Sequence, residues 1–258
     1  MISPSTDPVG VEIVETLAEI GYDYVELSLS DLMALPEPAF ARVVERVNRS
    51  GIRCETCNNF VPRRIPLTGS LARLDHALAY ASEAMDRAER IGVDTIVFGS
   101  SGAKNVPAGF PMDAAWRQLV EFLRHLGPMA AQRGLTIAIE PINRREANFI
   151  TLASEGLRLA REVGHPAVQL LIDFYHLMLE AEDFRLIAEA GPVLRHVHFA
   201  KVDGRRFPDS ETEDYRKFFG CLNQIGYSRR CSIEAYTDDF QTDARRTLLL
   251  LKRLVSTG

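Results

Sequence analysis

The sequence predicts an α/β fold, a (β/α)8 barrel with a short or incomplete first strand. Short β-prone runs occupy residues 25–30, 53–58, 95–100, 136–141, 169–174, 196–201 and 231–236. Segments with the 3.6-residue periodicity of amphipathic helices separate these runs, and such alternation predicts a parallel sheet. The regular spacing and the lack of a G-x-G-x-x-G turn favour a closed barrel over an open doubly wound sheet.

The helical segments have recognisable ends. LARLDHALAYASEAMDRAERIG and MDAAWRQLVEFLRHLGPMAAQRG precede the third and fourth runs, and glycine closes helices at Gly51, Gly92 and Gly134. The first helix is expected from Pro8 to Gly21, which leaves only MISPSTD for the first strand. We therefore expect a weak seam beside that strand. Since no linker or composition shift divides the chain, we expect one domain over residues 1–258.

Composition narrows the class of protein. The chain has 258 residues, of which 46% are hydrophobic and 25% charged, as in globular domains with a substantial core. The net charge of −5 is spread along the chain, which disfavours nucleic acid and anionic membranes as partners. No apolar run approaches the roughly 20 residues of a membrane span, and the first 20 residues lack signal-peptide features. We therefore expect a cytoplasmic protein.

Metal-capable side chains stand at the ends of the last four predicted strands. The active site of such a barrel lies at the carboxyl ends of its strands. Alternation along each strand places Ala138 with Glu140 on one face, and Leu171 with Asp173. His196 shares a face with His198, and Ser232 with Glu234. The four inward-facing residues nearest the barrel mouth are Glu140, Asp173, His198 and Glu234.

Three carboxylates and one imidazole would be costly together without a cation, because like charges raise each other's pKa values. Their mixed oxygen and nitrogen donors suit one divalent ion, Mn²⁺, Mg²⁺, Co²⁺ or Zn²⁺, and the absence of thiolates argues against a closed structural zinc site. The alternative is four unrelated polar groups that loops and water satisfy.

Four segments carry a family resemblance. EPINRRE at 140–146, DFYH at 173–176, HVHFAKVDGR at 196–205 and IEAY at 233–236 resemble the signature regions of the xylose isomerase-like sugar phosphate isomerase/epimerase superfamily. The likeness is greatest to its ketose 3-epimerase branch, and it extends over most of the chain from GYDYVELS at 21–28 onward.

The resemblance implies a (β/α)8 enzyme that binds a small-molecule sugar and one divalent metal. It implies metal ligands at Glu140, Asp173, His198 and Glu234, and sugar contacts from Glu146, His176 and an arginine. That arginine matches either Arg205 or Arg206, because the stretch after His198 runs KVDGRR. His176 falls in a loop beyond the strand, where we favour substrate contact over metal ligation. Related enzymes are often homodimers or homotetramers, so the resemblance implies that this chain could form a homodimer or a homotetramer.

Within this resemblance, Glu140 and Glu234 are the candidate catalytic residues. Two carboxylates on opposite sides of a ketose could remove and return the C3 proton through a cis-enediolate that the metal stabilises. Glu26 is either a pocket residue or a buried hydrogen-bonded acid, and Asn58, Asn59, Phe60 and Phe110 are expected at the pocket rim. For His196 we expect a structural role.

Other reactions of the superfamily stay open. Hydroxypyruvate isomerases and the dehydratases or isomerases of inositol catabolism resemble the chain in their metal sites and differ in substrate. The endonuclease IV type needs extra histidines at the ends of strands two to four, where this chain reads SLSD, TCNN and FGSS, so a nuclease is disfavoured. A metal-stabilised barrel without activity is disfavoured because the proton-transfer pair is present.

Overall fold

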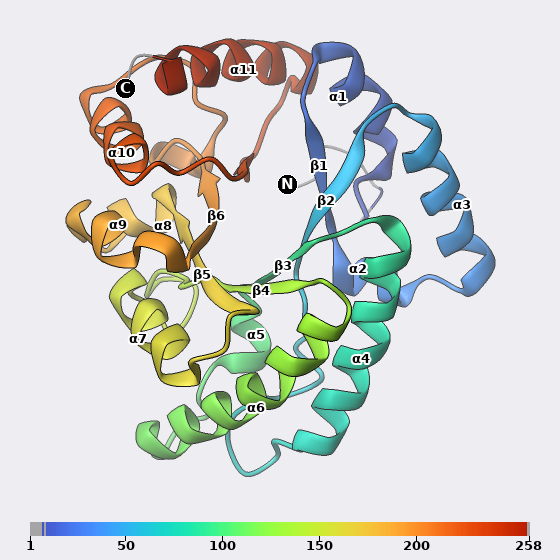
Figure 1. Cartoon of the computed structure of the whole chain (residues 1–258), viewed down its shortest axis with the longest axis vertical. Coiled ribbons are helices and arrows are strands. Elements are labelled where there is room, and N and C mark those ends of the chain that lie inside the picture. The colour runs from blue at the N-terminus through green and yellow to red at the C-terminus, as the bar shows by residue number, and fades with distance from the viewer. Residues whose placement is uncertain (1–6, 8, 257–258) are drawn as a thin grey trace.

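The structure is a computed structural model that describes residue 7 and residues 9–256. Its strands form one parallel sheet that curves into a nearly closed barrel, in the order β1-β2-β3-β4-β5-β6-β7. Figure 1 shows the strands around the centre and the helices outside them. The strands are β1 (Tyr24–Ser28), β2 (Arg53–Asn58), β3 (Thr95–Phe98), β4 (Thr136–Ile139), β5 (Val168–Asp173), β6 (Leu194–Phe199) and β7 (Cys231–Ile233).

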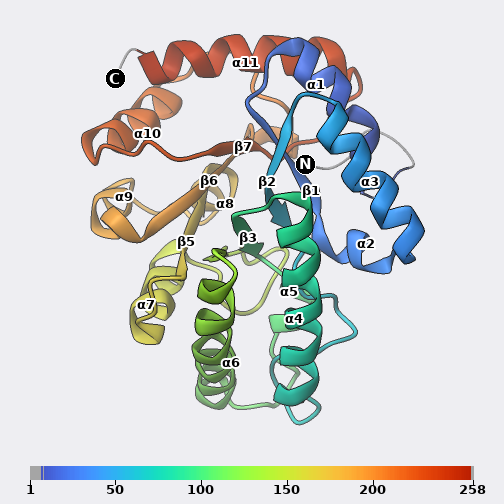
Figure 2. The same cartoon turned by 45° about the vertical axis from the view of Figure 1, so that its right-hand side comes forward.

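One or more helices follow each strand, as the alternation of the sequence predicts. Figure 2 shows α4, α6 and α7 side by side on the outside of the barrel. The α-helices are α1 (Val14–Ile20), α2 (Leu29–Ala34), α3 (Glu37–Arg49), α4 (Leu74–Ile91), α5 (Ser101–Lys104), α6 (Met112–Gln132), α7 (Ala153–Val163), α8 (Phe174–Leu179), α9 (Arg185–Ala190), α10 (Glu213–Gln224) and α11 (Phe240–Ser256). Short 3₁₀ helices are η1 (Val11–Ile13), η2 (Gly191–Val193) and η3 (Asp203–Arg205).

Apolar side chains pack on both faces of the sheet, which explains the alternation of residue types along the strands. Large side chains lie between the strands and the helices, where two clusters bury most of the core. Inside the barrel lies a small separate cluster of Val97, Ala138 and Leu171. Ala138 and Leu171 thus face inward, as predicted from their parity with Glu140 and Asp173. The apolar cluster inside the barrel is small and comes from β3, β4 and β5 alone.

The predicted boundaries are confirmed within a few residues, with one systematic difference. Several strands end two or three residues earlier than expected, because the chain turns at once into the next segment. The glycines expected at helix ends have left-handed backbones, with φ of 79° at Gly51, 93° at Gly92 and 68° at Gly134.

The predicted first strand falls in MISPSTD, of which only Asp7 is among the described residues. In the described sheet, β1 and β7 are the two outer strands of the order. Side chains join them, since Tyr24 Oη lies 2.7 Å from Ser232 Oγ. Within the same residues, no helix combines the length and the apolar character that crossing a bilayer requires.

Candidate metal centre

Four acidic and imidazole side chains meet at the carboxyl ends of the last four strands. Glu140 follows β4, Asp173 ends β5, His198 lies in β6 and Glu234 follows β7. Each offers a ligand atom within 4.8 Å of the ligand atoms of the other three. Glu140, Asp173 and His198 are buried, and the Glu234 side chain is 17% exposed. The structure therefore brings together the four residues that the alternation of inward-facing and outward-facing positions predicts at the barrel mouth.

His198 contacts carboxylates from two other strands. Its Nδ1 lies 3.1 Å from Glu140 Oε1 and 3.0 Å from Glu234 Oε2. Asp173 stands directly beside His198 in the pairing of β5 with β6. The backbone N–H of Tyr175 donates a 2.8 Å hydrogen bond to Asp173 Oδ1, which fixes that carboxylate at the end of its strand.

The charges of this cluster are poorly balanced by the protein alone. Burial would lower the pKa of His198, but Glu26, Glu234 and Glu140 raise it well above its ordinary value. Burial raises the pKa of Asp173, although His176 and Arg205 oppose the shift. A buried site with more acidic than basic groups favours a cation, and oxygen donors with one imidazole suit a hard or borderline divalent ion. The four donors thus fit one divalent metal.

Of the two candidate arginines, the structure brings only Arg205 to this cluster. Its Nη2 lies 2.5 Å from Glu234 Oε2 and 3.4 Å from Asp173 Oδ2. Arg206 instead pairs with Asp238, away from the donors. The backbone explains the difference: Gly204 and Arg205 have left-handed φ values of 67° and 50°, and Arg206 returns to an extended conformation.

Arg205 also connects the cluster to the turn after β4. Its Nη1 lies 3.4 Å from Glu146 Oε2, and its guanidinium carbon is 4.9 Å from the centre of the Tyr175 ring. Glu146 Oε1 accepts a 2.7 Å hydrogen bond from Asn143 Nδ2. The predicted sugar-binding residue Glu146 therefore lies beside the donors, at 40% exposure of its side chain.

His176 lies in the first turn of α8, so the expectation of a loop at this position is wrong. The helix begins directly after β5 because the Asp173 carboxylate caps it through the N–H of Tyr175. His176 is buried, its Nδ1 is 2.7 Å from Asn143 Nδ2, and its Nε2 is 3.5 Å from Asp173 Oδ2. Nε2 has no hydrogen-bond partner among the described residues. Burial lowers the pKa of His176, which favours a neutral ring.

A cleft of about 390 Å³, within the size range of small-molecule sites, reaches two of the four donors, Glu140 and Glu234. Asn58 and Asn59 line it, as expected, together with Ser30, Val61, Pro62, Arg63, Gly99, Ser100, Ser101, Gly102, Glu140, Ile142, Glu146, Arg205 and Glu234. Asn58 is buried, and its Oδ1 has no partner among the described residues. Phe60 and Phe110 are not rim residues: Phe60 is fully buried against Phe98, and Phe110 packs against the core.

Gly99, directly after β3, is a residue of the site that the sequence does not predict. A Cβ atom at Gly99 would stand 2.2 Å from Glu140 Oε2. The glycine therefore leaves the space that the Glu140 carboxylate fills. Its only signal in the sequence is a glycine directly after a buried strand, which also occurs where no ligand binds.

Comparisons with known proteins agree with this fold. A model of the family described as "Xylose isomerase-like TIM barrel" matches residues 14–254. The D-psicose 3-epimerase of Agrobacterium fabrum is 23% identical over 231 residues, covering 86% of this chain and 78% of the relative. A putative hydroxypyruvate isomerase of Homo sapiens is 30% identical over 140 residues, covering 48% of this chain and 50% of the relative.

A solved structure shows the same fold. It is the D-allulose 3-epimerase from Methylomonas sp. in complex with D-allulose, with a TM-score of 0.85 and 22% identity. The match covers 97% of this chain and 93% of that one. The family match over residues 14–254 includes the strand ends that carry the four donors.

Proposed function

Because the chain belongs to the xylose isomerase-like TIM barrel family, we propose that it is a divalent-metal-dependent enzyme that epimerises a ketose at C3. The observation that carries this proposal is the placement of two glutamates. Glu140 Oε1 and Glu234 Oε2 approach the same ring nitrogen of His198, from strands that β5 and β6 separate. A sugar in the cleft would have one carboxylate on each side.

The two glutamates divide the proton transfer between them. When bound, the divalent ion makes the C–H bond beside a ketose carbonyl more acidic. One carboxylate removes the C3 proton, and its electron pair enters an enediolate of the substrate. The other glutamate, protonated, delivers its proton to the opposite face of C3, which inverts that centre. The two glutamates then have exchanged protonation states, and the reverse reaction or exchange with solvent resets them.

The remaining cleft residues hold the substrate. Arg205 and Glu146 lie at the open side of the donors, where they can bind sugar hydroxyls, and we assign the arginine contact to Arg205. His176 offers an Nε2–H that the described residues leave without a partner. The unpartnered Asn58 Oδ1 can accept a hydrogen bond from a hydroxyl on the far side. Such contacts would hold C3 between the two glutamates.

Substitution of either glutamate tests the two-base scheme. Glu140→Gln and Glu234→Gln should each lower turnover by about 10²–10⁴-fold at saturating Mn²⁺, because each removes one proton-transfer group. The assay is deuterium uptake at C3 in D₂O over a panel of ketoses, followed by NMR.

Glu55→Gln is the matched control. Glu55 lies on β2, where Arg230 Nε contacts its Oε2 at 2.6 Å, and it does not line the cleft. It should retain wild-type turnover. Full activity in either Glu140→Gln or Glu234→Gln would refute the scheme.

An aldose–ketose isomerase is the second candidate. The similarity to a putative hydroxypyruvate isomerase favours it, and so does Arg63, an exposed cation at the cleft that makes no ion pair with another described residue. A free guanidinium suits a substrate with a carboxylate. In D₂O an aldose–ketose isomerase would place deuterium at the hydroxymethyl carbon beside the carbonyl, which is C1 of a ketose, and leave C3 of ketoses unlabelled.

A further inference from the structure

A buried carboxylate lies behind the metal donors. Glu26, on β1, is 4% exposed, and its Oε1 and Oε2 lie 3.0 Å and 3.2 Å from His198 Nε2. The other ring nitrogen of His198 faces Glu140 and Glu234. The imidazole is therefore held between Glu26 on one side and the donor cluster on the other.

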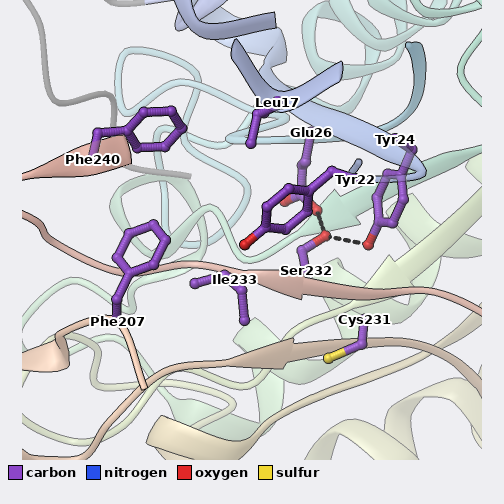
Figure 3. A pocket seen from close by; sticks show the side chains of 9 residues that line it. All are labelled: Leu17, Tyr22, Tyr24, Glu26, Phe207, Cys231, Ser232, Ile233 and Phe240. Atoms are coloured by element: carbon purple, nitrogen blue, oxygen red, sulfur yellow. Dashed lines mark hydrogen bonds between the residues drawn. The ribbon is translucent and has the colours of Figure 1, made fainter. Parts of the chain in front are cut away.

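Further hydrogen bonds fix the position of Glu26. Ser232 Oγ donates to Glu26 Oε2 at 2.6 Å, and His196 Nε2 lies 3.2 Å from the same oxygen. Tyr24 Oη lies 2.7 Å from Ser232 Oγ, and Figure 3 shows the hydrogen bonds from Tyr24 to Ser232 and from Ser232 to Glu26. Because Tyr24 and Glu26 come from β1 and Ser232 from β7, this network also crosses between the two outer strands.

The protons of the network can be assigned. An ionised carboxylate only accepts hydrogen bonds, so each partner of Glu26 must bring a proton. Ser232 brings its hydroxyl, and His196 and His198 bring their Nε2–H groups. If a metal takes the place of the proton on Nδ1, His198 keeps its Nε2–H on Glu26, and the Nδ1 lone pair faces the other donors.

We infer that Glu26 is a positioning residue that holds His198 in the tautomer and ring orientation that the divalent metal requires. The inference rests on the metal centre of the proposed function, and it concerns metal binding itself. Carboxylate partners of this kind orient metal-binding histidines, and their loss typically weakens metal affinity or activity by about 10–100-fold.

A second cation between Glu26, His196 and His198 is the competing interpretation, since these three also offer ligand atoms within 4.8 Å of one another. Two observations weigh against it. Glu26 already accepts from a serine hydroxyl, and His196 Nε2 lies 2.9 Å from the same Ser232 Oγ. His198 would also have to lose both ring protons to bind two ions.

Calorimetric titration of metal-stripped protein with Mn²⁺ alone tests the inference. We expect one site in the wild type, about 10-fold weaker affinity in Glu26→Gln and about 100-fold weaker affinity in Glu26→Ala. The glutamine keeps an acceptor for His198 but loses the charge. Glu55→Gln, the same change on the neighbouring strand, should bind Mn²⁺ like the wild type.

A spectrum separates positioning from general damage to the fold. Co²⁺ absorption in the visible reports the arrangement of its ligands, so Glu26→Ala should shift the bands while circular dichroism stays unchanged. If Glu26→Ala does not fold, Glu26→Gln and Ser232→Ala still test the inference. Each weakens the interaction that orients His198 and leaves the other residues of the network in place. Ser232→Ala should lower Mn²⁺ affinity less than Glu26→Gln.

Unchanged affinity in folded Glu26→Gln and Ser232→Ala would overturn the inference, and so would two Mn²⁺ sites in the wild type or none. The outcome is separate from that of the epimerase assay. Weaker binding in the variants of a protein that labels no ketose at C3 would keep the inference and refute the proposed reaction. Unchanged binding in variants of an active epimerase would do the reverse.

Discussion

Lys104 is a fully buried lysine beside Glu140, one of the four candidate metal donors. Its Nζ donates a 2.6 Å hydrogen bond to the backbone oxygen of Glu140 and lies 5.8 Å from the centre of the Phe98 ring. Burial lowers the pKa of Lys104 to about 7, although Glu140 and Glu155 oppose this shift. In the unfolded chain the ammonium keeps its proton to a pH of about 10.5. The folded state therefore binds fewer protons than the unfolded state between these values.

This difference predicts a pH dependence of stability. Between pH 7 and about 10.5 the free energy of unfolding should rise with pH, by up to ~1.4 kcal/mol per pH unit from this one group. Lys104→Met removes the titrating group and should flatten the rise. Urea unfolding of both proteins at pH 7.5 and pH 9, with a chelator present so that metal binding does not contribute, measures the difference. If the free energy of unfolding changed by the same amount between the two pH values in both proteins, the assignment would be contradicted.

At the scale of the element, the carboxyl ends of the strands take two different parts in the site. The ends of β4 to β7 carry the candidate metal donors. The end of β3 carries Gly99, whose lack of a side chain leaves room for one of these donors. The missing Cβ matters for a donor that comes from the next strand, because Glu140 Oε2 occupies its place. A glycine there shapes the site without touching a ligand.

Gly99→Ala should therefore impair function more than stability. The new methyl group would displace the end of a flexible side chain, which costs the fold little but moves a metal donor. We expect a loss of turnover on the order of 100-fold, since misplacement by about 1 Å can have that effect. Turnover and Mn²⁺ affinity are the measurements, with urea unfolding to confirm the fold.

Gly220→Ala is the control for this change. Gly220 lies in α10, and a Cβ there would meet no atom within 4 Å. It should keep wild-type turnover, and as an alanine within a helix it should be slightly more stable. If Gly99→Ala turns over as fast as Gly220→Ala, the space at the end of β3 has no part in the site.

Elements and inward faces were predictable because they rest on local periodicity. The alternation in β4 and β5 was enough to place Ala138 inward with Glu140, and Leu171 with Asp173. The start of α8 at Phe174 was not predictable in this way, because it depends on a cap that the Asp173 side chain makes. The choice between Arg205 and Arg206 depends on two left-handed residues, which the letters DGRR do not specify.

At the scale of the whole molecule, the candidate metal centre joins strands that are distant in the sequence. Its donors come from the ends of β4, β5, β6 and β7, so a bound ion would link the second half of the barrel. A ligand that binds only the folded state stabilises it by about 2.7 kcal/mol at a free concentration of 100 times the Kd.

Removal of metal should lower the stability of the protein accordingly. Urea unfolding in Mn²⁺ at 100 times the Kd, compared with unfolding in EDTA, should differ by about 2.7 kcal/mol. Asp173→Asn weakens a donor and should show a smaller difference or none. Identical unfolding of the wild type in both buffers would show that no ion binds preferentially to the folded chain.

The partners behind the donors show where prediction from the sequence stops. Glu26 could be read as a pocket residue or as a buried acid, because its contact with His198 spans 172 residues. The structure shows a buried acid that lines the small pocket of Figure 3 and not the cleft at the donors, with Ser232 and His196 as its further partners. Such contacts arise from closure of the barrel, and no local pattern encodes them.

Arg205 has a consequence for how strongly a sugar can bind. The guanidinium already lies against Glu234, Asp173 and Glu146. A substrate that binds this guanidinium must replace one or more of these carboxylates. Binding therefore exchanges one ion-pair partner for another and does not simply add a contact. The measured free energy of binding will therefore equal the free energy of the new contact less that of the ion pair that is lost.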